Sequence, residues 1–253
     1  MAFSPHASSS ILSSGKRWII RSPSSEHMMG AVHRYEGMVG DGLLPPAAYA
    51  RDDESPDDRF YVAPRRVVHI DDGAIGALGR LYAEVLPVGG RLLDLMSSWR
   101  SHLPEGLVSR EVVGLGLNAE EMADNPRLTS SIVHDVNRDP RLPFGNEEFD
   151  GAMCVVSIQY VTHPLLVFRE VRRVLRPGAP FVVSFSNRCF PTKAVAVWLG
   201  TTDQQHVELV RAYFEPAAGW LDVTGEDRSP GDDGDPLYAV WARASGTLSP
   251  SVR

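Results

Sequence analysis

The chain has 253 residues, 43% hydrophobic and 23% charged, a balance that excludes collagen-like, wholly disordered and disulfide-scaffold proteins. Its two cysteines are too few for a disulfide framework or a cysteine-based zinc site, and we expect no metal centre. No run of about 18 apolar residues occurs, so no membrane-spanning segment is predicted. The net charge of −7 argues against nucleic acid as a partner, because such a partner normally requires a basic surface.

The N-terminal stretch differs from the rest of the chain. Residues 1–25 contain nine Ser and neither Asp nor Glu, a composition typical of an organelle transit peptide. The alternative is a disordered tail or a translated upstream stretch, with the start near Met28 or Met29. We therefore expect a cytoplasmic protein, or a plastid or mitochondrial one if this leader is cleaved. The expected organisation is a leader and loosely ordered arm over 1–58, one domain over 59–246 and a tail over 247–253.

The hydrophobic pattern becomes regular after the arm. Ile75, Leu78 and Tyr82 lie at helical spacing and predict a helix over 73–87. In chain order we then expect a strand over 91–96, one or two turns of helix over 97–103, a strand over 111–117, a helix that begins after Asn118 with Glu121 as its capping-box partner, and a strand over 131–136.

The second half of the chain continues the alternation. A longer apolar run predicts a strand over 149–160, and Pro164 opens an amphipathic helix over 164–175. There follow a predicted strand over 180–187, helices over 194–200 and 203–214, and strands over 219–228 and 235–244 that form a hairpin around a Gly/Asp-rich turn.

This alternation predicts an α/β protein of the Rossmann-like, doubly wound type. Its seven-stranded sheet should be mostly parallel, with an antiparallel C-terminal hairpin. Ligands of such sheets bind at the carboxyl ends of the strands, so the residues that follow each strand are the candidates for a site.

Several segments, in this order and spacing, resemble the class I S-adenosylmethionine-dependent methyltransferases of the type 11 branch. They are RLLDLMSSWR, IVHDVNRDPRLPFGNEEFDGAMCVVSIQYV and VFREVRRVLRPGAPFVVSFSN, and the resemblance covers about residues 88–187. It implies S-adenosyl-L-methionine as the cofactor and an unidentified small molecule as the methyl acceptor.

Two positions depart from the family pattern. The first loop of the family is rich in glycine, whereas Asp94 is followed here by Leu-Met-Ser-Ser-Trp-Arg. Gly116 stands where the family usually has an acid that grips the ribose hydroxyls. The stretch SSWRSHLP, with Gly-Leu-Asn after the next strand, resembles a variant subgroup of this branch.

The resemblance implies a set of cofactor-binding residues. Ser97 and Ser98 are candidate donors to the methionine carboxylate, at the N-terminus of the short helix where an anion is favoured. Each also fits the role of a helix cap. The other candidates for the cofactor are Asp94, Asn118, Asp135, Val136 and Ser157.

Tyr160 and His163 follow the fourth strand and are the candidate bases for a proton on the acceptor. Their alternative roles are core packing for Tyr160 and a plain loop position for His163. Phe60 or Tyr61 is a candidate cover for the sulfonium by cation–π contact, the alternative being a patch that pins the arm.

The predicted helix over 164–175 also carries a row of arginines. Arg169, Arg172, Arg173 and Arg176 fall on one side of it, and we interpret them as a solvated outer face. The missing glycines and acid favour a second function, a non-catalytic methyltransferase-fold protein that acts as a binding or interaction module.

Overall fold

The computed structural model describes residues 43–217, 219–231 and 234–246, so the predicted leader and tail lie outside the described residues. Its strands form one seven-stranded sheet in the order β3-β2-β1-β4-β5-β7-β6. The strands are β1 (Arg91–Leu95), β2 (Glu111–Gly116), β3 (Ser130–Val133), β4 (Gly151–Val155), β5 (Pro180–Phe185), β6 (Trp220–Asp227) and β7 (Tyr238–Ala244). The first five pair in parallel and the last two add an antiparallel hairpin, which confirms the predicted fold class.

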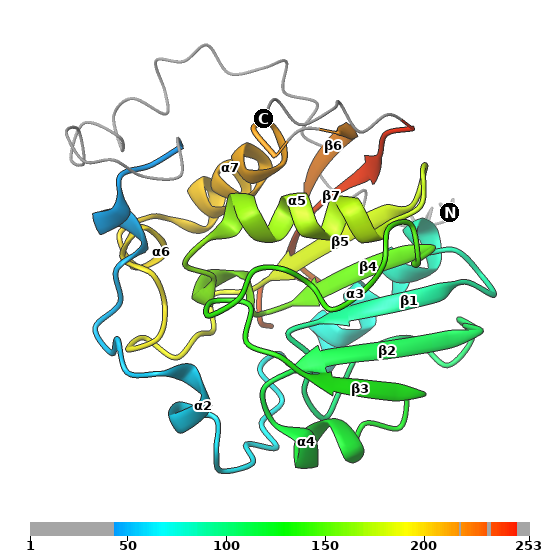
Figure 1. Cartoon of the computed structure of the whole chain (residues 1–253), viewed down its shortest axis with the longest axis horizontal. Coiled ribbons are helices and arrows are strands. Elements are labelled where there is room, and N and C mark those ends of the chain that lie inside the picture. Colours follow the sequence, from blue (N-terminus) through cyan, green and yellow to red (C-terminus); the bar gives the residue numbers. More distant parts are fainter. Residues whose placement is uncertain (1–42, 218, 232–233, 247–253) are drawn as a thin grey trace, which may run out of the picture.

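Helices cover both faces of the sheet. They are η1 (Pro46–Tyr49, a 3-10 helix), α2 (Asp57–Phe60), α3 (Asp72–Val85), α4 (Ala119–Ala123), η2 (Ile158–Tyr160, a 3-10 helix), α5 (Pro164–Val174), α6 (Ala196–Leu199) and α7 (Asp203–Phe214). Figure 1 shows α5 and α7 in front of the sheet and α3 behind it. Among the described residues, no helix combines the length and apolar character needed to cross a membrane.

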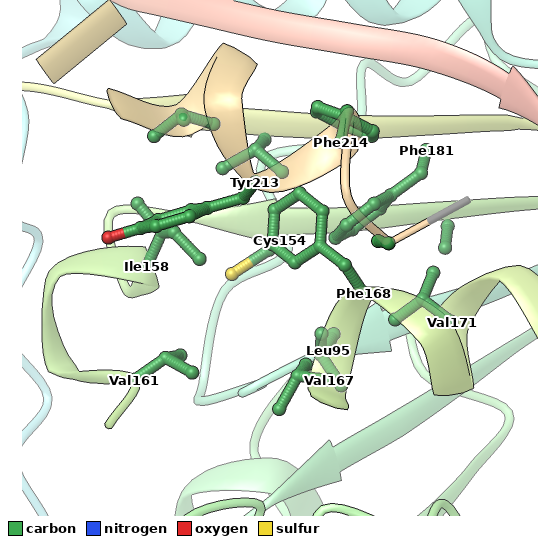
Figure 2. Close-up of a cluster of buried hydrophobic side chains, with 14 of the residues drawn as sticks. Leu95, Cys154, Ile158, Val161, Val167, Phe168, Val171, Phe181, Tyr213 and Phe214 are labelled. Carbon is green, nitrogen blue, oxygen red and sulfur yellow. The ribbon is translucent and has the colours of Figure 1, made fainter. Parts of the chain in front are cut away.

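The two faces bury separate apolar clusters, as the alternation of side chains along a strand requires. Leu93, Cys154 and Phe181 point toward α5 and α7, where Phe168 packs edge-on against Phe214 at 4.7 Å between ring centroids. Figure 2 shows Cys154, Phe168, Phe181 and Phe214 converging between the sheet and the two helices. On the opposite face, the strands pack against apolar side chains of α3. Both clusters fix the central strands and thereby the strand ends.

Part of the predicted arm packs tightly. Leu44, Ala48 and Tyr49 belong to the larger apolar cluster, and Asp57 is buried. Residues 43–58, which we expected to be loosely ordered, are therefore joined to the domain. The reason is that η1 supplies apolar side chains that the Pro-rich and acidic composition of this stretch concealed.

The segment after β1 differs from the prediction. Residues 97–103 form no helix, although one or two turns were expected. Hydrogen bonds from this segment go to side chains instead: the Asn125 amide donates to the Ser98 carbonyl at 2.8 Å and to Ser101 Oγ at 2.9 Å. The predicted helix N-terminus at Ser97 and Ser98 therefore does not exist.

Arg172 contradicts the prediction of a solvated arginine face on α5. Its side chain is 1% exposed. The guanidinium donates to the carbonyl of Gly219 at 2.9 Å, to that of Leu175 at 3.3 Å and to that of Ser245. Helical periodicity missed this role because two of the acceptors, Gly219 and Ser245, flank the distant C-terminal hairpin. Arg172 therefore ties α5 to both ends of the hairpin.

We expect Arg172→Leu to lower the free energy of unfolding by about 2 kcal/mol, because three carbonyls lose the charged donor of a buried guanidinium. This corresponds to a fall in melting temperature of roughly 4–8 °C for a domain of this size. Arg169→Leu, on the exposed side of the same helix, is the matched control and should change stability by less than about 0.5 kcal/mol. Equal melting temperatures for the two variants in a calorimeter would contradict the role of Arg172.

Candidate functional site

A pocket lies at the carboxyl ends of β1, β2 and β4. These strands point toward the side of the molecule on which α2 and the segment before α3 lie (Figure 1). The cavity measures about 120 Å³. Eight of the residues predicted from sequence line it: Asp94, Ser97, Ser98, Asn118, Asp135, Val136, Ser157 and Tyr160. Among the described residues, no cluster of three or more His, Cys, Asp or Glu is placed to hold a metal ion.

Asp94 holds the first loop together. Its Oδ2 accepts hydrogen bonds from Ser97 Oγ at 2.7 Å and from Ser101 Oγ at 2.6 Å. The side chain is 3% exposed. Burial raises the pKa of this carboxyl to about 6, against the two serine hydrogen bonds, which lower it. Asp94 is thus a carboxylate at neutral pH, but only at an energetic cost to the folded state.

The first loop keeps a glycine-like backbone without glycine. Met96 has a φ of 58°, in the left-handed region that glycine adopts most easily. His102, farther along the same segment, has a φ of 53°. The pKa of His102 is lowered to about 4, mainly by burial and further by the charge of Arg100. The loop therefore carries a neutral imidazole next to the pocket at neutral pH.

Gly116 allows the first loop to approach β2 closely. A Cβ at Gly116 would lie 2.1 Å from the carbonyl oxygen of Ser97. The loop is fixed there because Ser97 N–H donates to the Leu115 carbonyl at 2.8 Å. An acidic side chain has no room at this strand end. The path of the first loop therefore requires glycine at position 116.

Glu121 brings a carboxylate to the same side of the pocket. It lies in the first turn of α4 and is 5% exposed. Its Oε1 accepts from Arg65 N–H and its Oε2 from Ser98 Oγ, both at 2.5 Å. The predicted capping box forms only by half: Asn118 Oδ1 accepts from Glu121 N–H at 3.0 Å, while the Glu121 carboxylate turns to the pocket instead.

The predicted hydroxyl donors are already engaged. Ser97 Oγ donates to Asp94 and Ser98 Oγ donates to Glu121. The Asn118 amide donates to the carbonyl of Tyr61 at 2.9 Å. Each of these side chains lines the pocket, yet its polar hydrogens are directed at the protein. Their roles toward a cofactor stay predictions.

Asp135 and Val136 lie where the sequence predicts, after β3. Asp135 Oδ1 accepts from the N–H of Asn137 at 2.9 Å, which forms a local turn. Among the described residues, none donates a hydrogen bond to Asp135 Oδ2, so this oxygen is available to a ligand. Val136 is buried in the larger apolar cluster and forms part of the pocket wall.

The end of β4 carries an unusual backbone. Val156 has a φ of 46°, which is rare for a β-branched residue and marks local strain. Ser157 Oγ donates to the Val155 carbonyl at 2.8 Å. The turn directs Tyr160 inward, where its hydroxyl accepts from Phe190 N–H at 2.8 Å. Burial raises the pKa of Tyr160 to about 12, so its phenol is protonated at neutral pH.

His163 lies apart from the pocket of the cofactor candidates. It is exposed at the start of α5 and lines a second, more open cavity of about 1120 Å³. The two cavities adjoin, since both are lined by Arg51, Asp57, Asp135 and Asn137. The structure therefore brings together Tyr160 but not His163 with the predicted cofactor residues.

Residues 61–67, which follow the predicted arm and are called the arm from here on, contribute Tyr61, Arg65 and Val67 to the pocket lining. Trp99 Nε1 donates to the Val67 carbonyl at 3.0 Å, so the indole fastens the arm. Arg66 binds Glu120 and Asp124 on the outer side of α4, with shortest distances of 2.7 and 2.6 Å. The arm thus forms one wall of the pocket and is held to the first loop and to α4.

Sequence reasoning missed Glu121 and Arg65 as pocket residues. Glu121 was assigned to helix capping. Its position shortly after a strand that ends in glycine was the sequence signal that could have indicated a role in the pocket. Arg65 lies in the segment FYVAPRRVV, which shows no periodicity, so only the fold places it at the strand ends.

The sheet order, with its antiparallel C-terminal hairpin, is that of the Rossmann-like methyltransferase fold. Residues 101–183, about a third of the chain, match the model of a family described as "Methyltransferase domain". The match begins after Arg100, so the unusual loop 94–100 lies outside it.

Two curated relatives match short stretches. The chain is 30% identical over 83 residues to the biotin biosynthesis bifunctional protein BioHC of Teredinibacter turnerae, covering 32% of this chain and 15% of that protein. It is 32% identical over 78 residues to the methyltransferase phqN of Penicillium fellutanum, covering 28% and 24% of the two chains. The matches thus span less than a quarter of each relative.

Among solved structures, the chain resembles one in the complex between the Haloferax volcanii Trm112 methyltransferase activator and a methyltransferase. The TM-score is 0.53 at 15% sequence identity, over 70% of this chain and 92% of that chain. At this identity the likeness concerns the fold.

Proposed function

We propose that this protein is an S-adenosylmethionine-dependent methyltransferase that acts on a small-molecule acceptor. The observation that carries the proposal is the convergence of eight sequence-predicted residues, from the ends of β1 to β4, on one pocket. In a mostly parallel sheet this edge is where ligands bind. Four separate strand ends must be correctly placed for such a convergence, which makes an incidental cavity a poor explanation.

The residues of the pocket fit the chemistry of a nucleoside that carries a charged amino acid. Glu121 and Asp135 are acceptors for hydroxyl and amino groups, and Val136 offers an apolar wall. The volume of about 120 Å³ is smaller than the roughly 300–1,000 Å³ of typical small-molecule sites. Side chains of the lining must therefore rearrange to admit the whole cofactor.

Glu121 takes the place of the acid that Gly116 excludes. Its buried carboxylate would accept from the ribose hydroxyls in exchange for one of its present donors, Arg65 N–H or Ser98 Oγ. Asn118, whose amide donates to the arm in this conformation, remains a neutral candidate for the same hydroxyls. Asp135 and Val136 would contact the adenine.

Transfer of the methyl group needs alignment and exclusion of water more than it needs a strong base. The bound cofactor would supply an electrophilic methyl group on a sulfonium. Tyr160 has a pKa raised to about 12 and is a poor base at neutral pH, but it shapes the wall beside Phe190. His163, at the second cavity, is the better placed of the two to receive a proton from an acceptor bound there.

The test of the proposal is calorimetric titration with S-adenosylmethionine and S-adenosylhomocysteine. We expect binding, and we expect Glu121→Gln to weaken it about tenfold or more, as the loss of a charged hydrogen-bond acceptor predicts. Glu120→Gln, an exposed neighbour on the same helix that binds Arg66, is the matched control and should leave affinity within twofold.

The second candidate function is a non-catalytic module with the methyltransferase fold. The observation that favours it is that Ser97, Ser98 and Asn118 all donate to the protein itself. Absence of binding to either ligand at millimolar concentration, by protein that melts cooperatively, would refute the enzyme and support this module.

A further inference from the structure

The cations that line the pocket differ in whether an acid is paired with them. Arg51 and Lys193 are both neutralised by Asp57: Arg51 Nη1 lies 2.9 Å from Asp57 Oδ1, and Lys193 Nζ lies 3.1 Å from the same atom. Lys193 also contacts Asp53 Oδ2 at 3.2 Å. These two cations are engaged in a buried network and offer little charge to a ligand. The remaining permanent cations of the lining are Arg65 and Arg100.

Arg65 is supported by aromatic rings rather than by an acid. Its guanidinium carbon lies 4.0 Å from the centroid of the Phe60 ring and 5.7 Å from those of Tyr61 and Phe190. Arg65 Nη1 donates to the Phe60 carbonyl. Among the described residues, no carboxylate is paired with this guanidinium. Since a guanidinium has five N–H donors, most of them are available to a ligand.

The rings also restrict where the guanidinium can go. Phe60 packs edge-on against Tyr61 at 4.9 Å and against Phe190 at 5.5 Å. A cation seated on such faces keeps its charge and its in-plane donors free, because the ring contacts only the flat face. The face of Phe60 is therefore occupied by Arg65, and the suggested cover of a sulfonium by Phe60 does not hold in this conformation.

Other groups that might bind an anion are not available in the pocket. Ser97 and Ser98 donate to Asp94 and Glu121, and no helix begins at these serines. His69 and His102 have pKa values lowered mainly by burial, so both are neutral at pH 7. Arg100 also lines the pocket, but its side chain is exposed and its guanidinium lies 4.5 Å above the Trp99 ring, so water screens its charge more than that of the half-buried Arg65.

We propose that Arg65, seated on the Phe60 ring, binds the anionic group of the ligand of this pocket. The inference rests on the proposed function, under which this group is the carboxylate of the methionine portion of the cofactor. A fork of N–H donors suits a carboxylate, which accepts two parallel hydrogen bonds. The arm thus supplies the donor that serines and a helix N-terminus were expected to supply.

Two ligands that differ at the anion test this assignment. S-adenosylhomocysteine carries the carboxylate, whereas 5′-methylthioadenosine has the same nucleoside without it. We expect Arg65→Met to lower the affinity for S-adenosylhomocysteine by about 10- to 100-fold, the effect of losing a charged hydrogen bond. The affinity for methylthioadenosine should stay within twofold of that of the unaltered protein. Arg65→Lys should recover part of the loss. Arg66→Met, a neighbour that faces Glu120 and Asp124, is the matched control.

The possible outcomes separate the two proposals. Unchanged affinity of Arg65→Met for S-adenosylhomocysteine overturns the role of Arg65 alone. An equal loss for both ligands also overturns it, since Arg65 would then only hold the arm in place. If the unaltered protein binds neither ligand, the proposed function and this inference fail together. Melting curves of each variant establish that the protein tested is folded.

Discussion

Replacing Gly116 by alanine should lower the free energy of unfolding by more than about 3 kcal/mol, at the upper end of the range for overpacking. The added methyl group would lie 2.1 Å from the Ser97 carbonyl oxygen, a backbone atom that cannot turn aside. The loop must leave the strand, and the bonds from Ser97 N–H to Leu115 and from Ser97 Oγ to Asp94 are lost with it. Denaturant unfolding measures the effect.

The same reasoning predicts that Gly116→Asp, which restores the residue usual in the family, damages the protein instead of improving it. The matched control is Gly106→Ala, since a Cβ at Gly106 meets no atom within 4 Å. That substitution should stay within about 0.5 kcal/mol of the unaltered protein. Tighter binding of S-adenosylhomocysteine by a stable Gly116→Asp protein would show that the loop yields easily and that our account of Gly116 is wrong.

Asp94→Asn should change the pH dependence of stability by about 3 kcal/mol, the value of a shift of about two pKa units. The pKa of Asp94 is raised to about 6 in the folded protein, mainly by burial, whereas it is near 3.9 when unfolded. The folded state therefore binds the proton more tightly. The stability that Asp94 contributes is fully present below about pH 4 and is lost as the pH rises through about 6.

An asparagine has no such ionisation and can accept from Ser97 and Ser101 through its amide oxygen. We expect the difference in unfolding free energy, variant minus unaltered protein, to rise from pH 4 to pH 7.5. His102 changes stability with pH in the opposite direction. Its lowered pKa gives stability that is present above about pH 6.5 and is lost as the pH falls through about 4. Because both proteins contain His102, its effect cancels in the difference.

Chemical denaturation of the two proteins across this pH range gives the difference directly. Ser157→Ala, at the pocket but away from Asp94, is the control and should show a difference that does not vary with pH. A constant difference for Asp94→Asn would mean that the carboxyl titrates alike in the folded and unfolded states. A difference that falls with rising pH would mean that the loop stabilises the charged form.

The first loop packs closely on β2 although it lacks the glycines that are usual in the family. Close approach of the loop to β2 requires that one of the two partners lack a side chain, and here Gly116 is that partner. The left-handed turn remains at Met96, where methionine adopts it at some cost in backbone energy. Asp94, Ser97 and Ser101 then fasten the loop by side-chain hydrogen bonds.

The sequence by itself determined the fold class and most of the elements. The alternation of apolar strands with amphipathic helices predicts the sheet, its hairpin and the edge that carries the pocket, because each strand and helix must bury its own apolar side. The polar residues that follow four strands meet at one edge for the same reason. Eight of the nine predicted site residues consequently line one cavity.

Only the tertiary structure decided how the polar groups are used. Arg172 is buried where residues 219 and 245 accept its hydrogen bonds, Gly116 is required because the first loop passes close to β2, and Arg65 reaches the pocket because the arm lines it. Each of these contacts joins segments far apart in the chain. Local periodicity reports which side of an element is apolar, but it carries no information on which distant backbone or side chain will meet a given polar group.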